Sequence, residues 1–435
     1  MADTLAEPRP LAYGMEKATG AASILAFMAA LVLADVPAFM SFYLRASTWI
    51  FWAVMALLLA GCWRKLELGR LVRPLAPYFI WLAFYLTWGL IISAQRDYAF
   101  AVRLVATTAL LGATMAALLA NSANLRRFAT MLQLAAFANL LLLLLALRYP
   151  QLNDWIQLIT HRPVSLEVGF DRYGGLWNNP NILAYICLLA AIFSCHAAPW
   201  SAWLGRLTCL PIMYYSASRK STLLFLVVLL LYVIMVQRRN IRFWYGALIA
   251  MVVLAMAFTA SANLQRESRS ASRDANLVRL LDVEEENTVA RGGESRVGLL
   301  KDWLSTLSAE PWYGYGLNAM FGDQYSEKDP NRMVQKGLVW NGTHNTYLGM
   351  WIDAGPVGFL AFMLMILPYA KSSFTYRGQP TARWVVVSLA LVNLCFLFVS
   401  HSMLSSLEGQ VTYTLMFLLP TCPALRGPIR SARAY

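Results

Sequence analysis

About a dozen runs of mostly apolar residues, each long enough to cross a bilayer, constrain the fold of this chain more than any other feature. A helical span needs about 20 such residues, and in lipid the backbone has to satisfy its own hydrogen bonds. Only 14% of the residues are charged, against about 25% in soluble domains, which excludes a soluble alternative. We predict an all-α polytopic membrane protein with helices at 21–44, 47–63, 75–93, 99–120, 128–148, 180–197, 201–217, 221–237, 243–260, 346–370, 383–402 and 407–422.

The positive charges favour one orientation for these helices. Lys and Arg are expected in cytoplasmic loops, and they follow the second, fourth, eighth, tenth and last predicted helices. Both termini are therefore expected in the cytoplasm, and the first helix is expected to be retained rather than cleaved as a signal peptide. The same bias explains the net charge of +13, so we expect no nucleic-acid partner.

This orientation divides the chain into three parts. Residues 1–260 are predicted to hold nine helices and an outer segment at 149–179. Residues 261–345 form a large, mainly helical outer loop, and residues 346–435 hold three helices and a cytoplasmic tail. No internal repeat supports an inverted-repeat transporter, for which Asp35 and Arg103 are the main candidates at mid-membrane.

Arg219 and Lys220 break the charge rule, because they lie in a very short outer loop directly before an apolar run. They also begin a predicted helix, where the macrodipole disfavours positive charge. A bound anion would resolve both conflicts, since helix N-termini and Arg or Lys side chains suit phosphate. The alternative is that both side chains snorkel to lipid phosphates. We favour a dedicated anion site.

Two further polar segments are predicted on the outer side. The first runs from Arg172, through two glycines, to Asn181 at the start of the sixth helix, and ordinary turn and cap chemistry also accounts for it. The second carries Arg291 and Arg296, then a helical pattern of apolar residues and the Pro-Trp-Tyr-Gly-Tyr-Gly run at 311–316. Alone, this second pattern is explained as well by a helix and its end as by a binding site.

His344 lies where the large outer loop ends and the tenth helix begins. Asn341 or Thr343 can cap that helix, which would place His344 in its first turn. The positive end of the helix and nearby arginines would both disfavour imidazolium, and a neutral imidazole could act as a general base. A structural role for a histidine at a helix start is the alternative.

Several absent patterns narrow the chemistry. No Asp-x-Asp pair occurs in the chain, which argues against a glycosyltransferase that holds a divalent metal with such a pair. Neither a Walker-type glycine loop nor a Gly-x-Ser-x-Gly hydrolase elbow is present. We therefore expect no metal, no ATP and no other cofactor.

Together, these motifs resemble the superfamily of bacterial O-antigen ligases and Wzy-type polymerases. The matching pieces, in chain order, are the Gly…Asn-Pro-Asn stretch at 174–181, Ser-Arg-Lys at 218–220, the pattern from Arg296 to Gly316, and His-Asn-Thr-Tyr-Leu at 344–348. With about twelve predicted helices and one large late outer loop, the resemblance covers nearly the full chain.

The resemblance implies a multi-pass enzyme of the bacterial inner membrane that uses undecaprenyl-diphosphate-linked glycans in the periplasm. The arginines that match Arg219 and Arg296 would bind the diphosphate, and the histidine that matches His344 would be the catalytic base. Lys220 and Arg291 are added to the diphosphate site. Further candidates for substrate binding are Arg172, Asn181, Tyr347 and the acidic residue near the outer end of a late helix, Glu408.

Two reactions are open within this superfamily. Ligases transfer O-antigen to a lipid A–core acceptor, whereas polymerases join repeat units. Some polymerases carry an Arg followed eleven residues later by Gly in their outer loops, and no such spacing occurs in the outer loops here. A ligase is therefore favoured, with a polymerase as the alternative and a flippase or transporter of lipid-linked glycans as the third reading.

Overall fold

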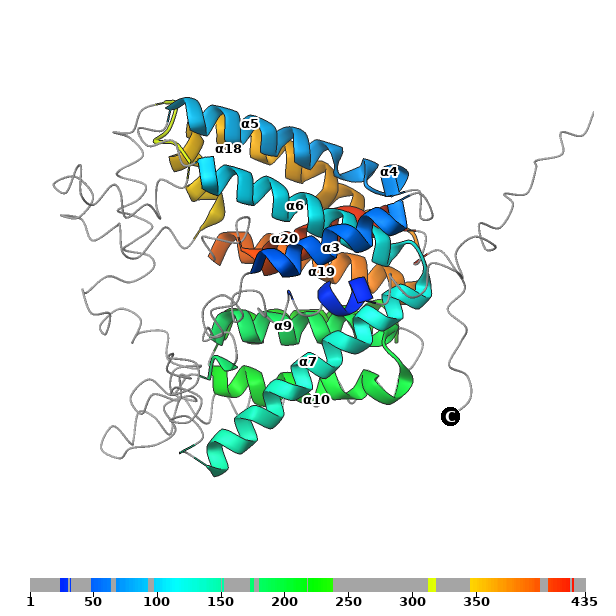
Figure 1. The fold of residues 1–435 in the computed structure, drawn as a ribbon. Helices are drawn as coiled ribbons and strands as arrows, with labels where there is room; N and C mark the ends of the chain where they lie inside the picture. Colours follow the sequence, from blue (N-terminus) through cyan, green and yellow to red (C-terminus); the bar gives the residue numbers. More distant parts are fainter. Residues whose placement is uncertain are drawn as a thin grey trace, which may run out of the picture.

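The computed structural model describes a bundle of helices, and all regular structure in its described part is helical (Figure 1). The predicted helix at 243–260 lies outside the described residues, as does most of 21–44. Of the large loop at 261–345, the described part is 312–317 together with Asn345. The described residues are 24–29, 32, 48–63, 68–92, 98–149, 151, 173–175, 180–216, 218–237, 312–317, 345–399, 406–422 and 425.

Ten of the predicted helices coincide with observed ones. They are the seven from 47–63 to 221–237 and the three from 346–370 to 407–422. The observed elements are α3 (Thr48–Trp63), α4 (Leu68–Leu71), η2 (Arg73–Leu75), α5 (Ala76–Ile92), α6 (Tyr98–Leu119), α7 (Ser122–Arg148), α9 (Pro180–Phe193), η4 (Ser194–His196), α10 (Pro199–Ser216), α11 (Arg219–Met235), α18 (Thr346–Phe374), α19 (Pro380–Val399), α20 (Leu407–Leu418) and η6 (Leu419–Thr421).

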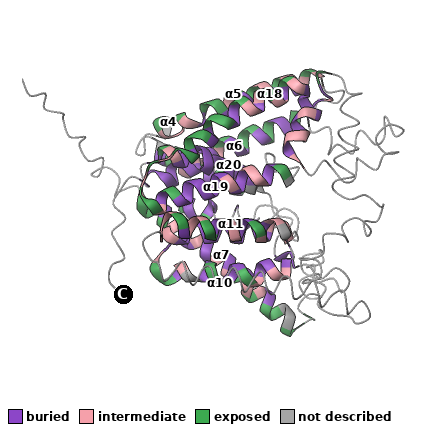
Figure 2. Cartoon of the chain, turned by 180° about the vertical axis from the view of Figure 1, so that it is seen from behind, coloured by how far each residue is buried: buried purple, intermediate pink, exposed green. Residues whose placement is uncertain are grey.

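The helices have the length and surface of a membrane protein. Five are long and apolar enough to cross a bilayer, and three apolar helices are shorter, at Trp49–Cys62, Pro180–His196 and Lys220–Met235. Exposed side chains line the outward faces of the bundle, whereas α19 and α20 are mostly buried (Figure 2). The exposed ones include large apolar residues such as Leu57 and Leu364, at 73% and 65%. Lipid is the solvent that such faces require.

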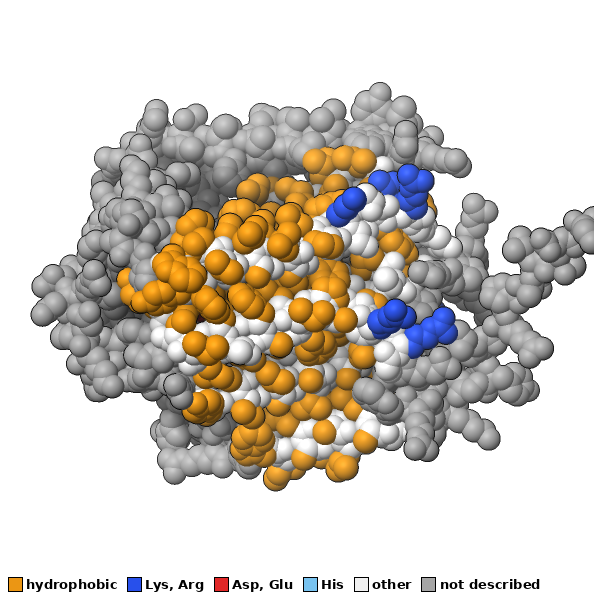
Figure 3. Space-filling model, turned by 90° about the horizontal axis from the view of Figure 1, so that it is seen from above, with side chains coloured by type: hydrophobic (Ala, Val, Ile, Leu, Met, Phe, Trp, Pro, Cys, Tyr) orange, Lys and Arg blue, Asp and Glu red, His pale blue; other side chains and the backbone are white. Residues whose placement is uncertain are grey.

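Most of the described cations lie at one end of the bundle, whereas Lys220 and Arg148 lie toward the other. Hydrophobic side chains cover the face seen in Figure 3, and its Lys and Arg side chains lie along one edge. We name this the inner end and the opposite one, where α9, α11 and α18 begin, the outer end. The distribution is the one that the positive-inside rule expects. The residues at the inner end are Arg70, Arg73, Arg126, Arg127, Lys371, Arg377 and Arg383.

One helix begins earlier than its apolar run. The run predicts a start at 128, but α7 begins at Ser122 because the side chain of Asn121 caps it, accepting a hydrogen bond from Asn124 N at 2.8 Å. Side-chain capping of this kind satisfies an otherwise unpaired backbone amide. Arg126 and Arg127 therefore lie within the first turns of α7 rather than in a loop.

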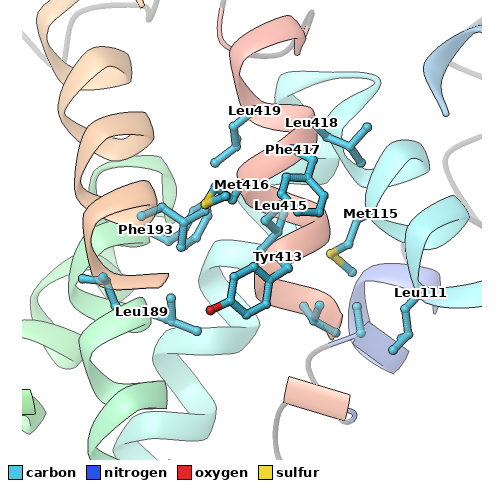
Figure 4. Close-up of a cluster of buried hydrophobic side chains, with 14 of the residues drawn as sticks. Leu111, Met115, Leu189, Phe193, Tyr413, Leu415, Met416, Phe417, Leu418 and Leu419 are labelled. Atoms are coloured by element: carbon cyan, nitrogen blue, oxygen red, sulfur yellow. The ribbon is translucent and has the colours of Figure 1, made fainter. Parts of the chain in front are cut away.

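Helix α20 packs at the centre of the bundle. Its side chains face Leu111 and Met115 of α6 on one side and Leu189 and Phe193 of α9 on the other (Figure 4). Polar contacts accompany this packing, because Asn393 of α19 donates to the carbonyl of Thr412 and accepts from Tyr185 of α9. Tyr413 of α20 in turn donates to Asn393 O. In lipid, such packing and hydrogen bonds hold helices together.

Helix α18 is broken near its outer end, which the uninterrupted run at 346–370 did not predict. Gly355 has φ 66° and ψ −174° and is followed by Pro356, so two helical halves meet there. The 312–317 segment of the large outer loop packs against this break (Figure 1). Its backbone amides at Tyr315 and Gly316 donate to the carbonyls of Ile352 and Asp353, both at 2.9 Å.

Two glycines make this close packing feasible. A Cβ on Gly355 would lie 2.1 Å from the Trp312 carbonyl oxygen, and one on Gly314, where φ is +86°, would lie 2.6 Å from Asp353 O. Side chains rarely adopt a positive φ, and real Cβ atoms do not approach backbone so closely. Gly314 therefore lets the 312–317 segment contact α18 closely.

We predict that Gly355→Ala lowers the apparent Tm of the purified protein, because the new Cβ meets both backbone strain and a clash. The strain alone costs about 1–3 kcal/mol, because this backbone conformation is essentially restricted to glycine. The matched control is Gly61→Ala in α3, where nothing lies within 4 Å of the added Cβ and the helix should gain about 0.5–1 kcal/mol. Equal Tm values for the two variants would contradict the docked break.

Candidate functional site

Two helices begin side by side at the outer end. Ser218, the N-cap residue of α11, donates from Oγ to Asn181 Oδ1 at the start of α9 over 3.1 Å. Ser218 Oγ also lies 3.0 Å from Ser221 Oγ. Because α9 and α11 both run inward from this point, the positive ends of the two helix dipoles are adjacent. Such an arrangement suits an anion.

Lys220 points from the start of α11 toward α19. Its Nζ lies 4.7 Å from the centroid of the Phe396 ring, and that ring is buried and 4.2 Å from the ring of Tyr185. This contact turns the side chain toward the bundle, whereas a snorkelling side chain extends outward to lipid phosphates. Arg219 is the first residue of α11, and its side chain lies outside the described part.

The segment that follows Arg172 is fixed between α7 and α10. Tyr173 is buried; its backbone amide donates to Tyr215 O at 2.7 Å and its hydroxyl to Asn139 O at 2.9 Å. Burial raises the pKa of Tyr173, so the hydroxyl stays a donor. Gly175 has φ 57°, and a Cβ there would lie 2.5 Å from Asn139 Oδ1. Residues 173–175, where a turn was expected, are therefore held against α7 and α10 by these hydrogen bonds.

The start of α18 corrects one expectation. Neither Asn341 nor Thr343 caps this helix. Asn345 does, with its side chain accepting from Leu348 N at 3.1 Å, and the helix begins at Thr346. His344 therefore precedes the cap rather than lying in the first turn, and it is itself outside the described residues.

Tyr347 and Lys220 approach α19 from different sides. The ring of Tyr347 lies 4.5 Å from that of Phe398, whereas Lys220 contacts Phe396. Side chains two residues apart on a helix point in nearly opposite directions, because each residue turns the helix by about 100°. The structure thus brings both predicted residues to the outer end of one helix, α19, without bringing them together.

The remaining predicted residues are placed less completely. Glu408 is the second residue of α20, whose N-cap Ser406 accepts from Gly409 N at 3.2 Å; the Glu408 side chain is not among those described. Outside the described residues altogether are Arg172, Arg291, Arg296 and His344.

Sequence reasoning missed Asp353. Among the side chains that the structure describes, it is the one carboxylate. It is 6% exposed and accepts a hydrogen bond from the Tyr85 hydroxyl at 2.7 Å. A lone acidic residue inside the apolar run at 346–370 was the available signal, since charges within spans are costly and mark functional positions.

The polar groups at the starts of α9 and α11 are a hydroxyl pair, an amide and an ammonium group, which can bind an anion. Across the described ranges, no three His, Cys, Asp or Glu side chains come close enough to hold a metal ion.

Comparison with known proteins finds a family that is similar to part of this chain. Residues 204–363, from α10 through the break in α18, match the family model described as O-Antigen ligase. The matched region contains Lys220, the 312–317 segment, His344, Tyr347 and Asp353, whereas Asn181 and Glu408 lie outside the match.

The chain is also similar to a Haemophilus influenzae protein named "Uncharacterized protein". It is 24% identical to this chain over 171 residues, which is 38% of this chain. The chain spans 42% of the length of this relative.

We predict that the bond between Ser218 and Asn181 couples the N-terminus of α11, inside the region that matches the O-antigen ligase family, to α9 outside it. In a double-mutant cycle with Ser218→Ala and Asn181→Ala, the coupling energy from thermal unfolding should be about 0.6–1.7 kcal/mol, the range of interhelical hydrogen bonds in membranes. The matched control replaces Ser201, whose Oγ bonds Ala198 O at the inner end. Ser201→Ala and Asn181→Ala should be additive, and additivity in the first cycle as well would contradict the link.

Proposed function

We propose that this chain is a glycosyltransferase of the bacterial inner membrane that transfers O-antigen from undecaprenyl diphosphate to a sugar hydroxyl of lipid A–core. The observation that carries the proposal is the paired start of α9 and α11, with Lys220 turned into the bundle. The similarity of residues 204–363, which include Lys220 and the start of α11, to the O-antigen ligase family supports the same conclusion. The reaction would take place on the periplasmic side, with both termini in the cytoplasm.

The diphosphate of the donor would lie at the adjacent starts of α9 and α11. Lys220 and Arg219 supply positive charge there, and the two helix dipoles add to it. Arg296, Arg291 and Arg172 would complete the site from the two outer segments. Each charge-assisted hydrogen bond contributes about 1.5–3 kcal/mol. Clustered cations can stabilise a departing diphosphate without a metal ion.

His344 would act as the general base. It would take the proton from the acceptor hydroxyl while that oxygen attacks the anomeric carbon of the donor. The bond from this carbon to the diphosphate oxygen breaks, undecaprenyl diphosphate leaves, and direct displacement predicts inversion. General-base catalysis contributes about 10²–10⁴-fold.

The placement of α19 suggests how the two substrates meet. Lys220 and Tyr347 contact α19 at Phe396 and Phe398. With the diphosphate at Lys220, the reacting sugar would lie across the outer end of α19. Tyr347 and Glu408 flank that region from α18 and α20. Both substrates are lipid-anchored, so the site would open to the bilayer as well as to water.

A lipid-linked-glycan transporter is the second candidate, and a specific observation favours it. A broken helix with a buried carboxylate beside the break, as at Asp353 and Gly355, is a feature of transporters. The paired cations at the outer surface favour the transferase instead, because a bound diphosphate requires them there.

The deciding experiment is reconstitution of the purified protein with undecaprenyl-diphosphate glycan and lipid A–core, in EDTA and without ATP. Glycosylated lipid A–core is the expected product, and His344→Ala should abolish it while donor binding persists. Longer lipid-linked glycan with an untouched acceptor would assign a polymerase. Donor movement between leaflets without any product would assign a transporter.

We predict that Lys220→Ala weakens binding of the donor by about tenfold or more, because one charge-assisted contact is lost. The matched control is Lys371→Ala, which removes an exposed cation at the inner end and should leave affinity unchanged. Affinity can be measured by titrating the donor lipid in nanodiscs. Equal affinities for the two variants would exclude Lys220 from the diphosphate site.

A further inference from the structure

The carboxylate of Asp353 lies inside the bundle at the break of α18. Its Oδ2 accepts from the hydroxyl of Tyr85 on α5 over 2.7 Å, in a buried contact. Its own backbone carbonyl accepts from Gly316 N. The second half of α18 begins just after it, at Pro356, so the positive end of that half-helix is close by. One residue thus joins α5, α18 and the docked loop segment.

Helix α5 contacts the same loop segment along one face. Trp88 Nε1 donates to Tyr313 O at 3.0 Å. A Cβ on Gly89 would lie 2.4 Å from Leu317 Cδ2, so Leu317 is seated directly against that glycine. Tyr85, Trp88 and Gly89 are spaced as neighbours on one face of a helix. The 312–317 segment is therefore held between α5 and the break of α18.

We propose that Tyr85 and Asp353 are positioning residues for the transfer reaction. Their hydrogen bond keeps α5 against the broken part of α18 and so maintains the surface on which the 312–317 segment docks. This segment is the described part of the chain between Gln237 and Asn345, the interval that also holds Arg291, Arg296 and His344. The hydrogen bond between Tyr85 and Asp353 therefore fixes where the interval that holds the proposed catalytic residues joins the bundle.

The inference rests on the proposed function for its kinetic part only. Docking of the 312–317 segment can be measured without any substrate. The amides of Tyr315 and Gly316 are hydrogen-bonded to α18, and hydrogen–deuterium exchange of a peptide that contains them reports undocking directly.

The first test compares two Tyr→Phe variants that each remove a hydroxyl joining α18 to the α5 region. Tyr85→Phe removes the bond at the outer end. Tyr369→Phe removes the bond to Pro74 O at the inner end and is the matched control. We expect Tyr85→Phe to speed exchange at 315–316 by about tenfold, the factor for a lost hydrogen bond to a charged group, and to lower kcat more than it raises donor KM. Tyr369→Phe should change neither, and equal effects would overturn the proposal.

The second test replaces Asp353. Asp353→Asn keeps an acceptor for Tyr85 and removes the charge, whereas Asp353→Ala removes both. A positioning role predicts near-normal exchange and kcat within about threefold for Asp353→Asn, with a loss of about tenfold or more for Asp353→Ala. If Asp353→Asn abolishes turnover while exchange at 315–316 is unchanged, the carboxylate acts on substrate or proton, and the proposal is wrong.

The two readouts separate the failure of this proposal from the failure of the proposed function. If the wild-type protein makes no glycosylated product but Tyr85→Phe still speeds exchange, the ligase assignment fails and docking by this pair stands. If the wild type is active and Tyr85→Phe leaves exchange unchanged, the positioning proposal fails alone.

Discussion

The structure depends on one constraint: in a bilayer, every backbone amide and carbonyl needs a partner within the protein. The break at Gly355 leaves carbonyls of the first half of α18 without partners from that helix. The amides of Tyr315 and Gly316 donate hydrogen bonds to these carbonyls. The tight backbone contacts at Gly314 and Gly355 follow from these hydrogen bonds. A segment of the large outer loop is therefore part of the membrane bundle, not an appendage to it.

The same constraint explains why polar side chains hold the centre together. Lipid is as apolar as the helix surfaces, so burial alone does not drive these helices to associate. Asn393 contacts α9 and α20 through hydrogen bonds, and Ser218 joins the starts of α9 and α11. These contacts fix the relative positions of the outer helix ends, and the proposed anion site is made of those ends.

Most of the fold could be predicted from the sequence because apolar length determines where a helix can cross a membrane. Caps were harder to predict: Asn121 starts α7 before its apolar run, and Asn345 rather than Asn341 or Thr343 caps α18. The break at Gly355 could not be predicted, since glycine and proline are common within spans and its cause is a contact with distant residues. Lys220 and Asn181 were predicted as site residues from helix-start chemistry, but their partners Phe396 and Ser218 depend on tertiary packing.

The order of synthesis gives the break in α18 a consequence for biogenesis. Asp353 is separated from Tyr85 by 268 positions, and the loop segment that caps the break also precedes it in the chain. When α18 leaves the translocon, both of its partners have already been made and delivered to the membrane. The first half of this helix can therefore be released into lipid with its carbonyls satisfied, and docking of the 312–317 segment is completed by the arrival of α18.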